Sequence, residues 1–232
     1  MLATRIIPTI LTDKGHLVKG EGIKSDRIVG NALQAARIHG MRGVDEIMLL
    51  DVTATKEGLE PDYEMVKSLT DKCFSPVTVG GGIKTVEHVE KLLKAGADKV
   101  CLSAWKESVI SIVSNKFGKQ CVVVSIDVGN DIFLALNCAK NAEKIGAGEI
   151  LLQSMSRDGT MKGYDLDLIK AVSGAVSIPV VASGGCSGYE DMFDAIEAGA
   201  SAIAAGALFQ FTDATPKGAA EYLKERNVEV RV

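Results

Sequence analysis

The sequence predicts an α/β fold of the (βα)8, or TIM-barrel, class. Eight short apolar runs alternate with amphipathic stretches, and the second half of the chain repeats the first. Strands that alternate with helices and are buried on both faces form parallel sheets. The length of 232 residues, 47% of them hydrophobic, suits one barrel domain spanning 1–232. The alternative is an open doubly wound sheet.

The eight apolar runs mark the expected strands. Aromatic residues are only 5% of the chain, so Val, Ile and Leu must fill most of the core. In chain order the strands are expected at 5–11, 46–51, 76–80, 98–103, 121–127, 149–154, 178–183 and 201–206.

Helices are expected between these strands, where apolar residues recur three and four apart. Several of these stretches reach a glycine, a common C-terminal stop. The clearest cover residues 62–73, 86–96, 165–176 and 189–199.

The repeat relates two halves of the chain. Residues 76–100 align without gaps with residues 179–203, and GVDEIMLL at 43–50 matches GAGEILLQ at 146–153 at the same offset of 103 residues. A unit this long is too large for a solenoid. We therefore expect two half-barrels, approximately 1–118 and 119–232.

Composition narrows the classes of partner and site. Lys and Arg total 26 against 30 Asp and Glu, a balance that does not suggest binding to nucleic acid or to a membrane surface. The five cysteines are scattered and the histidines isolated, so we expect no disulfide framework, no metal and no cofactor. With no spanning apolar run and no signal-peptide layout, a cytoplasmic protein is expected.

Two glycine-rich segments fall where barrel enzymes place their active sites, after the carboxyl ends of strands. Backbone without a Cβ atom lets amides approach an anion closely. Taken singly, each is more often a tight turn, but their symmetry favours a ligand with a phosphate at each end. The expected cradles contain Gly81, Gly82, Ser103 and Ala104 on one side and Ser183, Gly184, Gly185, Ala205 and Gly206 on the other.

At this point the chain resembles a known family, HisF, the cyclase subunit of imidazole glycerol phosphate synthase. The resemblance runs over nearly the whole chain and is specific as a set. The motifs that carry it are RIIP, VKG, DEIMLLD, TVGGGI, GADKV, VVVSID, GAGEILL, SRDGTMKGYD and ASGG.

The resemblance implies a barrel that joins a HisH-type glutaminase in a heterodimer. Ammonia released from glutamine would pass through the barrel to its mouth and react with a ribulosyl bisphosphate. The products would be imidazole glycerol phosphate and an aminoimidazole carboxamide ribotide. In that family two aspartates serve as acid and base, at the ends of strands 1 and 5. Asp127 matches the second, but Leu11 stands at the first position, with Asp13 as a poor substitute two residues on.

Other positions depart from the family pattern as well. Ser103-Ala104 replaces the usual Asn-Thr, the segment after strand 5 is short, and Gln153 and Ser156 replace residues near the substrate. Asp158 and Gly159 are kept in the substrate-binding set, and Lys19 and Asp51 in supporting positions. The half of the site built by strands 6–8 therefore looks better preserved.

The opposite end of the barrel keeps its pattern. Family members gate ammonia entry with four charged residues, which match Arg5, Glu46, Lys99 and Glu149 here. Alternating charges let such a ring hold together, although ordinary surface salt bridges are an alternative interpretation. Asp98 is expected to help dock the glutaminase.

The leading interpretation is an ammonia-conducting subunit paired with a HisH-type glutaminase. It resembles HisF-like paralogues thought to supply a sugar amidotransferase in surface-polysaccharide synthesis. One alternative is a true cyclase of histidine biosynthesis, with Asp13 or water replacing the missing acid. Another is a non-catalytic partner that only activates the glutaminase. A phosphorylated small molecule or phosphate is the expected ligand.

Overall fold

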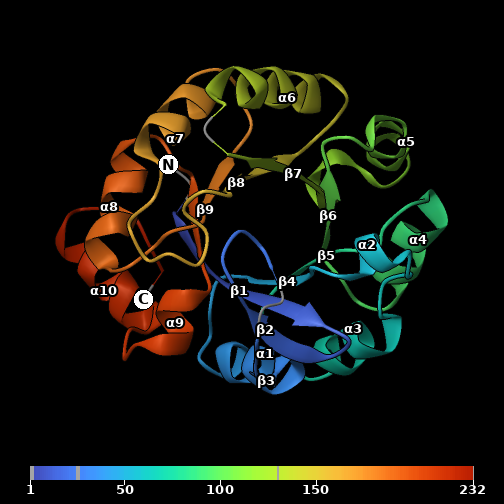
Figure 1. The fold of residues 1–232 in the computed structure, drawn as a ribbon, viewed down its shortest axis with the longest axis horizontal. Helices are drawn as coiled ribbons and strands as arrows, with labels where there is room; N and C mark the ends of the chain where they lie inside the picture. Colours follow the sequence, from blue (N-terminus) through green and yellow to red (C-terminus); the bar gives the residue numbers. More distant parts are fainter. Residues whose placement is uncertain (1–2, 25–26, 130, 232) are drawn as a thin grey trace.

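The computed structural model describes residues 3–24, 27–129 and 131–231, and within them the chain forms a closed (βα)8 barrel. Figure 1 looks into the barrel, with the strands in the centre and helices around them. Parallel pairing of β1 with β10, Arg5 opposite Ala202, closes the sheet and rules out the open alternative. The barrel strands are β1 (Arg5–Asp13), β4 (Ile47–Asp51), β5 (Val77–Gly80), β6 (Lys99–Ser103), β7 (Val122–Val128), β8 (Glu149–Ser154), β9 (Val180–Ser183) and β10 (Ala202–Ala205).

Each predicted strand overlaps one of these barrel strands, and its ends differ by no more than two residues. Strands β9 and β10 begin 103 residues after β5 and β6, which is the offset of the sequence repeat. The division into half-barrels near residue 118 stays a prediction.

The helices that surround the barrel begin at capped residues. Asp62, Thr85, Asp131 and Asp165 each accept a hydrogen bond from a backbone N–H three residues on, which satisfies a donor that the helix leaves open. No helix in the described ranges is long and apolar enough to span a membrane. The helices are α1 (Ala32–Met41), α2 (Ala54–Glu57), α3 (Tyr63–Thr70), α4 (Val86–Lys94), α5 (Glu107–Phe117), the 3-10 turn η1 (Lys119–Cys121), α6 (Ile132–Lys144), α7 (Leu166–Ser173), α8 (Tyr189–Glu197), α9 (Ala207–Phe211) and α10 (Pro216–Glu225).

An antiparallel hairpin follows β1, where no strand is predicted. It consists of β2 (His16–Lys19) and β3 (Arg27–Asn31), and β2 pairs back onto the end of β1. Between β1 and β2 the chain turns at Lys14 and Gly15, with φ values of 47° and 82°, as expected of a tight two-residue turn. Strands this short carry little periodicity, so the hairpin escapes detection by pattern.

Alternation along the strands decides which side chains face the barrel axis. On β1, Arg5, Ile7, Thr9 and Leu11 form the inward row, while Ile6 and Ile10 pack outward against the helices. The same alternation aligns Glu149, Leu151 and Gln153 on β8. Each inward row thus runs from the N-terminal end of the barrel to its mouth.

Candidate functional site

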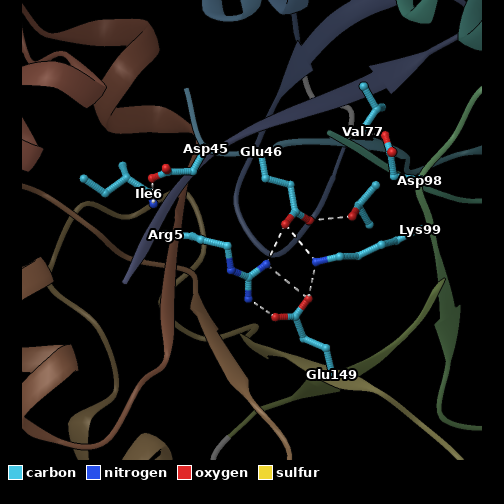
Figure 2. A network of polar contacts seen from close by, with 9 residues as sticks. Arg5, Ile6, Asp45, Glu46, Val77, Asp98, Lys99 and Glu149 are labelled. Atoms are coloured by element: carbon cyan, nitrogen blue, oxygen red, sulfur yellow. Dashed lines mark hydrogen bonds and ion pairs between the residues drawn. The ribbon is translucent and has the colours of Figure 1, made fainter. Parts of the chain in front are cut away.

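Four charged side chains close the N-terminal end of the barrel. Figure 2 shows Arg5, Glu46, Lys99 and Glu149, here called the charge ring, pointing toward one another. Arg5, Lys99 and Glu149 are the first residues of β1, β6 and β8, and Glu46 directly precedes β4. The ammonium nitrogen of Lys99 lies 2.8 Å from Glu46 Oε2 and 2.9 Å from Glu149 Oε2. Arg5 donates to both of the same carboxylates. Each cation therefore bridges both anions.

The two carboxylates of the ring are much more buried than its cations. The side chains of Glu46 and Glu149 are 2% and 7% exposed, against 25% for Arg5 and 21% for Lys99. Burial pushes the pKa of Glu46 up, but Lys99, the Thr78 hydroxyl and Arg5 together hold it below its ordinary value. Burial also opposes the charge of Arg5, and the two glutamates more than compensate, so that its pKa is raised.

Two further carboxylates near the ring bind backbone. Asp45 accepts from the amide of Ile6 at 3.0 Å and Asp98 from the amide of Val77 at 2.8 Å. Each joins the start of one strand to the segment that leads into the neighbouring strand: Asp45 lies two residues before β4, and Asp98 one residue before β6 (Figure 2). The Asp98 carboxylate thus accepts a hydrogen bond that links two strands, and its role in docking a glutaminase stays a prediction.

Above the ring the barrel interior is apolar. Buried inward residues from seven strands pack together with Leu50 and leave no charged group at this level among the described residues. They are Ile7, Met48, Cys101, Val123, Leu151, Val181, Ala202 and Ala204. Burial raises the pKa of the Cys101 thiol well above its usual value, so this cysteine stays neutral.

At the mouth the inward rows end in two cavities. The first, called the cradle, has a volume of about 40 Å³, room for a few water molecules or one small anion. Most residues predicted for the strand 6–8 half line it together: Lys19, Asp158, Gly159, Ser183, Gly184, Gly185, Ala205 and Gly206.

Glycine is required at the base of the cradle. Gly184 and Gly185 have φ values of 93° and 100°, and a Cβ atom would lie 2.6 Å from Ser154 O and 2.2 Å from Gly163 O, respectively. Thr9 also lines the cradle, and its buried hydroxyl has no hydrogen-bond partner among the described residues. A buried polar group of this kind favours a ligand or water that completes its bonding.

Lys19 is the buried cation of the cradle. Its Nζ would lie 2.6 Å from a Cβ atom on Gly206, so the ammonium group faces the end of β10. Burial lowers the pKa of Lys19 to about 8, and Asp158 opposes this effect. Burial raises the pKa of Asp158 in turn, against hydrogen bonds from the Ile23 amide and Gln153 and the charge of Lys19. The site holds a cation that an anionic ligand would stabilise.

The second cavity, called the Asp127 cavity, is larger, about 320 Å³. It is lined by Asp51, Gly81, Gly82, Ser103 and Asp127. Ala104 is not part of this lining, and its amide donates to Ser125 O at 3.0 Å.

Two amides that the sequence assigns to phosphate binding are thus engaged elsewhere. The amide of Gly82 donates to Thr55 Oγ1 at 3.1 Å, and that of Ala104 to Ser125. Asp51 accepts from the Thr53 and Ala54 amides at 2.9 and 2.8 Å and so positions the start of α2. This half of the mouth offers fewer donors to an anion than the cradle.

Asp127 and Leu11 lie in different cavities. Asp127 is open to solvent at the mouth, yet the surrounding wall desolvates its carboxylate enough to raise its pKa, against a hydrogen bond from Ser125. Leu11 is 7% exposed and lines the cradle. Asp13 accepts from Thr53 Oγ1 at 2.8 Å and lines neither cavity. The structure therefore does not bring Asp13 together with Asp127.

The mouth residues that were not predicted include Ser125, Lys106 and Ile23, as well as Thr9. Ser125 shares the inward row of Asp127, a relation that strand alternation could have revealed. Lys106 adds a cation to the Asp127 cavity from the turn after β6. Ile23 lines both cavities and donates its amide to Asp158 at 2.8 Å, with a φ of 54° that is rare for a β-branched residue. Only the folded hairpin places it there.

Comparison with known proteins gives one consistent family. A family model described as "Histidine biosynthesis protein" matches residues 5–215. The chain is 42% identical to an imidazole glycerol phosphate synthase subunit HisF of Endomicrobium trichonymphae and 43% to one of Hyphomonas neptunium, covering 96% and 99% of those proteins. It is 40% identical, over all of both chains, to a "putative imidazole glycerol phosphate synthase subunit hisF2" of Campylobacter jejuni.

Proposed function

This chain belongs to the histidine biosynthesis protein family, among the HisF-type subunits of imidazole glycerol phosphate synthase, and on that premise we propose that it conducts ammonia through its barrel to an acceptor at the mouth. The observation that carries the proposal is the contrast along β1. Arg5 takes part in a complete charge ring at one end, and Leu11 stands at the other end where the cyclisation chemistry needs an acid.

The charge ring supports an entrance role. Among the described residues, its four members pair with one another and with Thr78, so rotation of one cation away from the axis leaves the carboxylates still partly neutralised. Opening of this kind keeps each buried carboxylate paired with its second cation, whereas loss of both cations would leave a buried charge uncompensated. A HisH-type glutaminase, bound at this end, would release ammonia directly beneath it.

The apolar layer above the ring supports selectivity for neutral ammonia. Ammonium would lose its hydration among Ile7, Met48 and Leu151 without any compensating charge, which is strongly unfavourable. Neutral ammonia carries no such cost. The charge would therefore be left behind at the ring, and ammonia would arrive at the mouth as a nucleophile.

The mouth supports transfer more than cyclisation. Without a carboxylate at Leu11, one of two positioned acid–base groups is missing, and such a group typically contributes about 10²–10⁴-fold in rate. The acceptor we propose is a sugar bound to a separate amidotransferase in surface-polysaccharide synthesis. The alternative is cyclisation within histidine biosynthesis. The retained Asp127 and the names of the Endomicrobium and Hyphomonas relatives favour that alternative. A purely activating role toward the glutaminase is the third possibility.

The test is replacement of one cation of the ring. In a complex reconstituted with a HisH-type glutaminase, Lys99→Ala leaves two carboxylates against Arg5 and should change glutamine-dependent transfer severalfold. Use of added ammonium should stay nearly unchanged, because ammonium reaches the mouth from solution. The readout is slow formation of the imidazole product from the family's ribulosyl bisphosphate with each nitrogen source.

Lys94→Ala is the matched control. Lys94 pairs with Glu90 on the surface of α4, where its side chain is 75% exposed, and should affect neither nitrogen source. An equal effect of Lys99→Ala on both sources would mean that the ring is only structural, and the conduit proposal would be abandoned.

A further inference from the structure

A third cavity adjoins the cradle on its outer side. It has a volume of about 370 Å³ and lies between the β2–β3 hairpin and α9, with Lys24, Arg27 and Phe211 in its wall. Four residues line both it and the cradle: Lys19, Gly20, Gly159 and Ala207. We call it the outer basic cavity. The shared wall makes the two spaces neighbours, with Lys19 at their boundary.

The charge of the outer basic cavity is predominantly positive. Among its described lining residues, Lys19, Lys24 and Arg27 stand against one carboxylate, Glu21. Neither Lys24 nor Arg27 belongs to the barrel framework, since both lie on the hairpin and are exposed. Like charges gathered around a concave surface repel one another unless an anion lies between them.

Arg27 contacts an aromatic ring of α9. Its guanidinium carbon lies 4.7 Å from the centre of the Phe211 ring, a cation–π contact that ties the hairpin to α9. This contact does not use the N–H groups of the guanidinium for a hydrogen bond. These groups match the oxygens of a phosphoryl group, which Arg can bind through two parallel hydrogen bonds.

The sizes of the two cavities indicate what one ligand could fill. The cradle, at about 40 Å³, takes a single small anion beside Gly184, Gly206 and the Thr9 hydroxyl. A monophosphate bound there would leave the outer basic cavity without an anionic ligand, its excess positive charge opposed only in part by Glu21. A second anionic group attached directly to the first would reach across the shared wall past Lys19.

We propose that the cradle and the outer basic cavity together bind a diphosphate ester, with one phosphoryl group in each. This ligand differs from a bisphosphate with its phosphates far apart, which would instead span the cradle and the Asp127 cavity. The inference rests on the phosphate-binding role of the cradle and is independent of ammonia transfer.

The test compares inorganic phosphate with inorganic pyrophosphate by titration calorimetry on the full chain at constant ionic strength. Pyrophosphate should bind about tenfold more tightly, the gain expected of added charged hydrogen bonds. Lys24→Met combined with Arg27→Met should remove this preference and leave phosphate affinity within about twofold. UDP against UMP repeats the comparison with an ester.

The control is Lys140→Met combined with Lys170→Met, which removes the same charge from exposed positions on α6 and α7 and should keep the preference. Lys24→Met alone, expected to reduce the preference partly, guards against loss of the hairpin. Phosphate binding without tighter pyrophosphate binding would overturn the diphosphate inference, as would a preference that survives in the double variant. If neither phosphate nor pyrophosphate binds, the assignment of phosphate binding to the cradle would be overturned instead.

Discussion

The two ends of the barrel use charge in opposite ways. At the N-terminal end, Arg5, Glu46, Lys99 and Glu149 satisfy one another. At the mouth, Lys19 and the Thr9 hydroxyl face a cavity. Burial disfavours the charged form of Lys19, and the Thr9 hydroxyl has no hydrogen-bond partner among the described residues. The same strands supply both ends. The charges at one end are satisfied within the protein, whereas the proposed anion would be needed to complete the other.

This difference teaches what each end can tolerate. Deleting one of the two nearly buried carboxylates of the ring removes a partner of both Arg5 and Lys99, so the effect falls mainly on folding. Under the proposals made above, changing Lys19 or Leu11 at the mouth should instead affect binding or rate, because the group that each would act on belongs to a ligand. Three experiments test whether changes in the ring and changes at the mouth have these different effects.

The largest effect is expected from Glu46→Ala. Removing a carboxylate that is 2% exposed and contacts Arg5, Lys99 and Thr78 should lower the free energy of unfolding by about 3 kcal/mol. Because the pKa of Glu46 is lowered on folding, its contribution is present above its ordinary value of 4.5 and is lost as the pH falls through the folded value. Urea unfolding from pH 7 to pH 3 measures both effects.

Asp71→Ala provides the comparison. Asp71 pairs with Lys67 on the surface, where both side chains are more than half exposed, and its loss should cost well under about 1 kcal/mol. Equal losses for Glu46 and Asp71 would show that the ring is no more self-sufficient than a surface pair.

The next largest effect is expected at Leu11. Leu11→Asp places a carboxylate at the mouth and should raise the rate of imidazole formation from the ribulosyl bisphosphate and ammonium by up to about 10²-fold. Leu11→Asn has nearly the same shape but cannot exchange a proton, and should leave the rate low. The assay is steady-state product formation. A native rate on the order of 10 s⁻¹ would show that the mouth already cyclises and would favour the histidine-pathway interpretation.

The smallest effect concerns the cradle and pH. Because the pKa of Lys19 is lowered to about 8, a growing fraction of Lys19 is neutral in the free protein above that pH. Sulfate, whose charge is constant in this range, should bind several-fold more weakly at pH 9 than at pH 7 and take up protons near pH 8. Calorimetry in two buffers measures both, and Lys19→Met should abolish the pH dependence. Unchanged sulfate affinity across this range would place the anion away from Lys19.

The barrel itself could be predicted because its signals are local. Apolar runs, helical spacing and the repeat each survive in the sequence without knowledge of distant contacts. The identity of the ring residues came from family resemblance, and the structure brings all four side chains together.

The mouth was less predictable because its details depend on contacts between distant segments. The Gly82 amide is engaged by Thr55, and the Ala104 amide by Ser125, although both sequences look suited to binding an anion. Ile23 reaches the mouth through a hairpin too short to show periodicity and is held there by Asp158, 135 positions further along the chain. No local pattern encodes such a contact.

The closing pair of strands also sets an order of events during synthesis. Strand β1 can complete the barrel only with β10, so Arg5 leaves the ribosome roughly 10–40 s before Ala202 at ordinary translation speeds. Glu46, Lys99 and Glu149 emerge in between, 41, 94 and 144 residues after Arg5. Until Ala202 follows, the nascent sheet has two open edges. Once Lys99 has emerged, the ring consists of two cations and one carboxylate, and Glu149 balances its charge 53 residues before Ala202 allows the barrel to close.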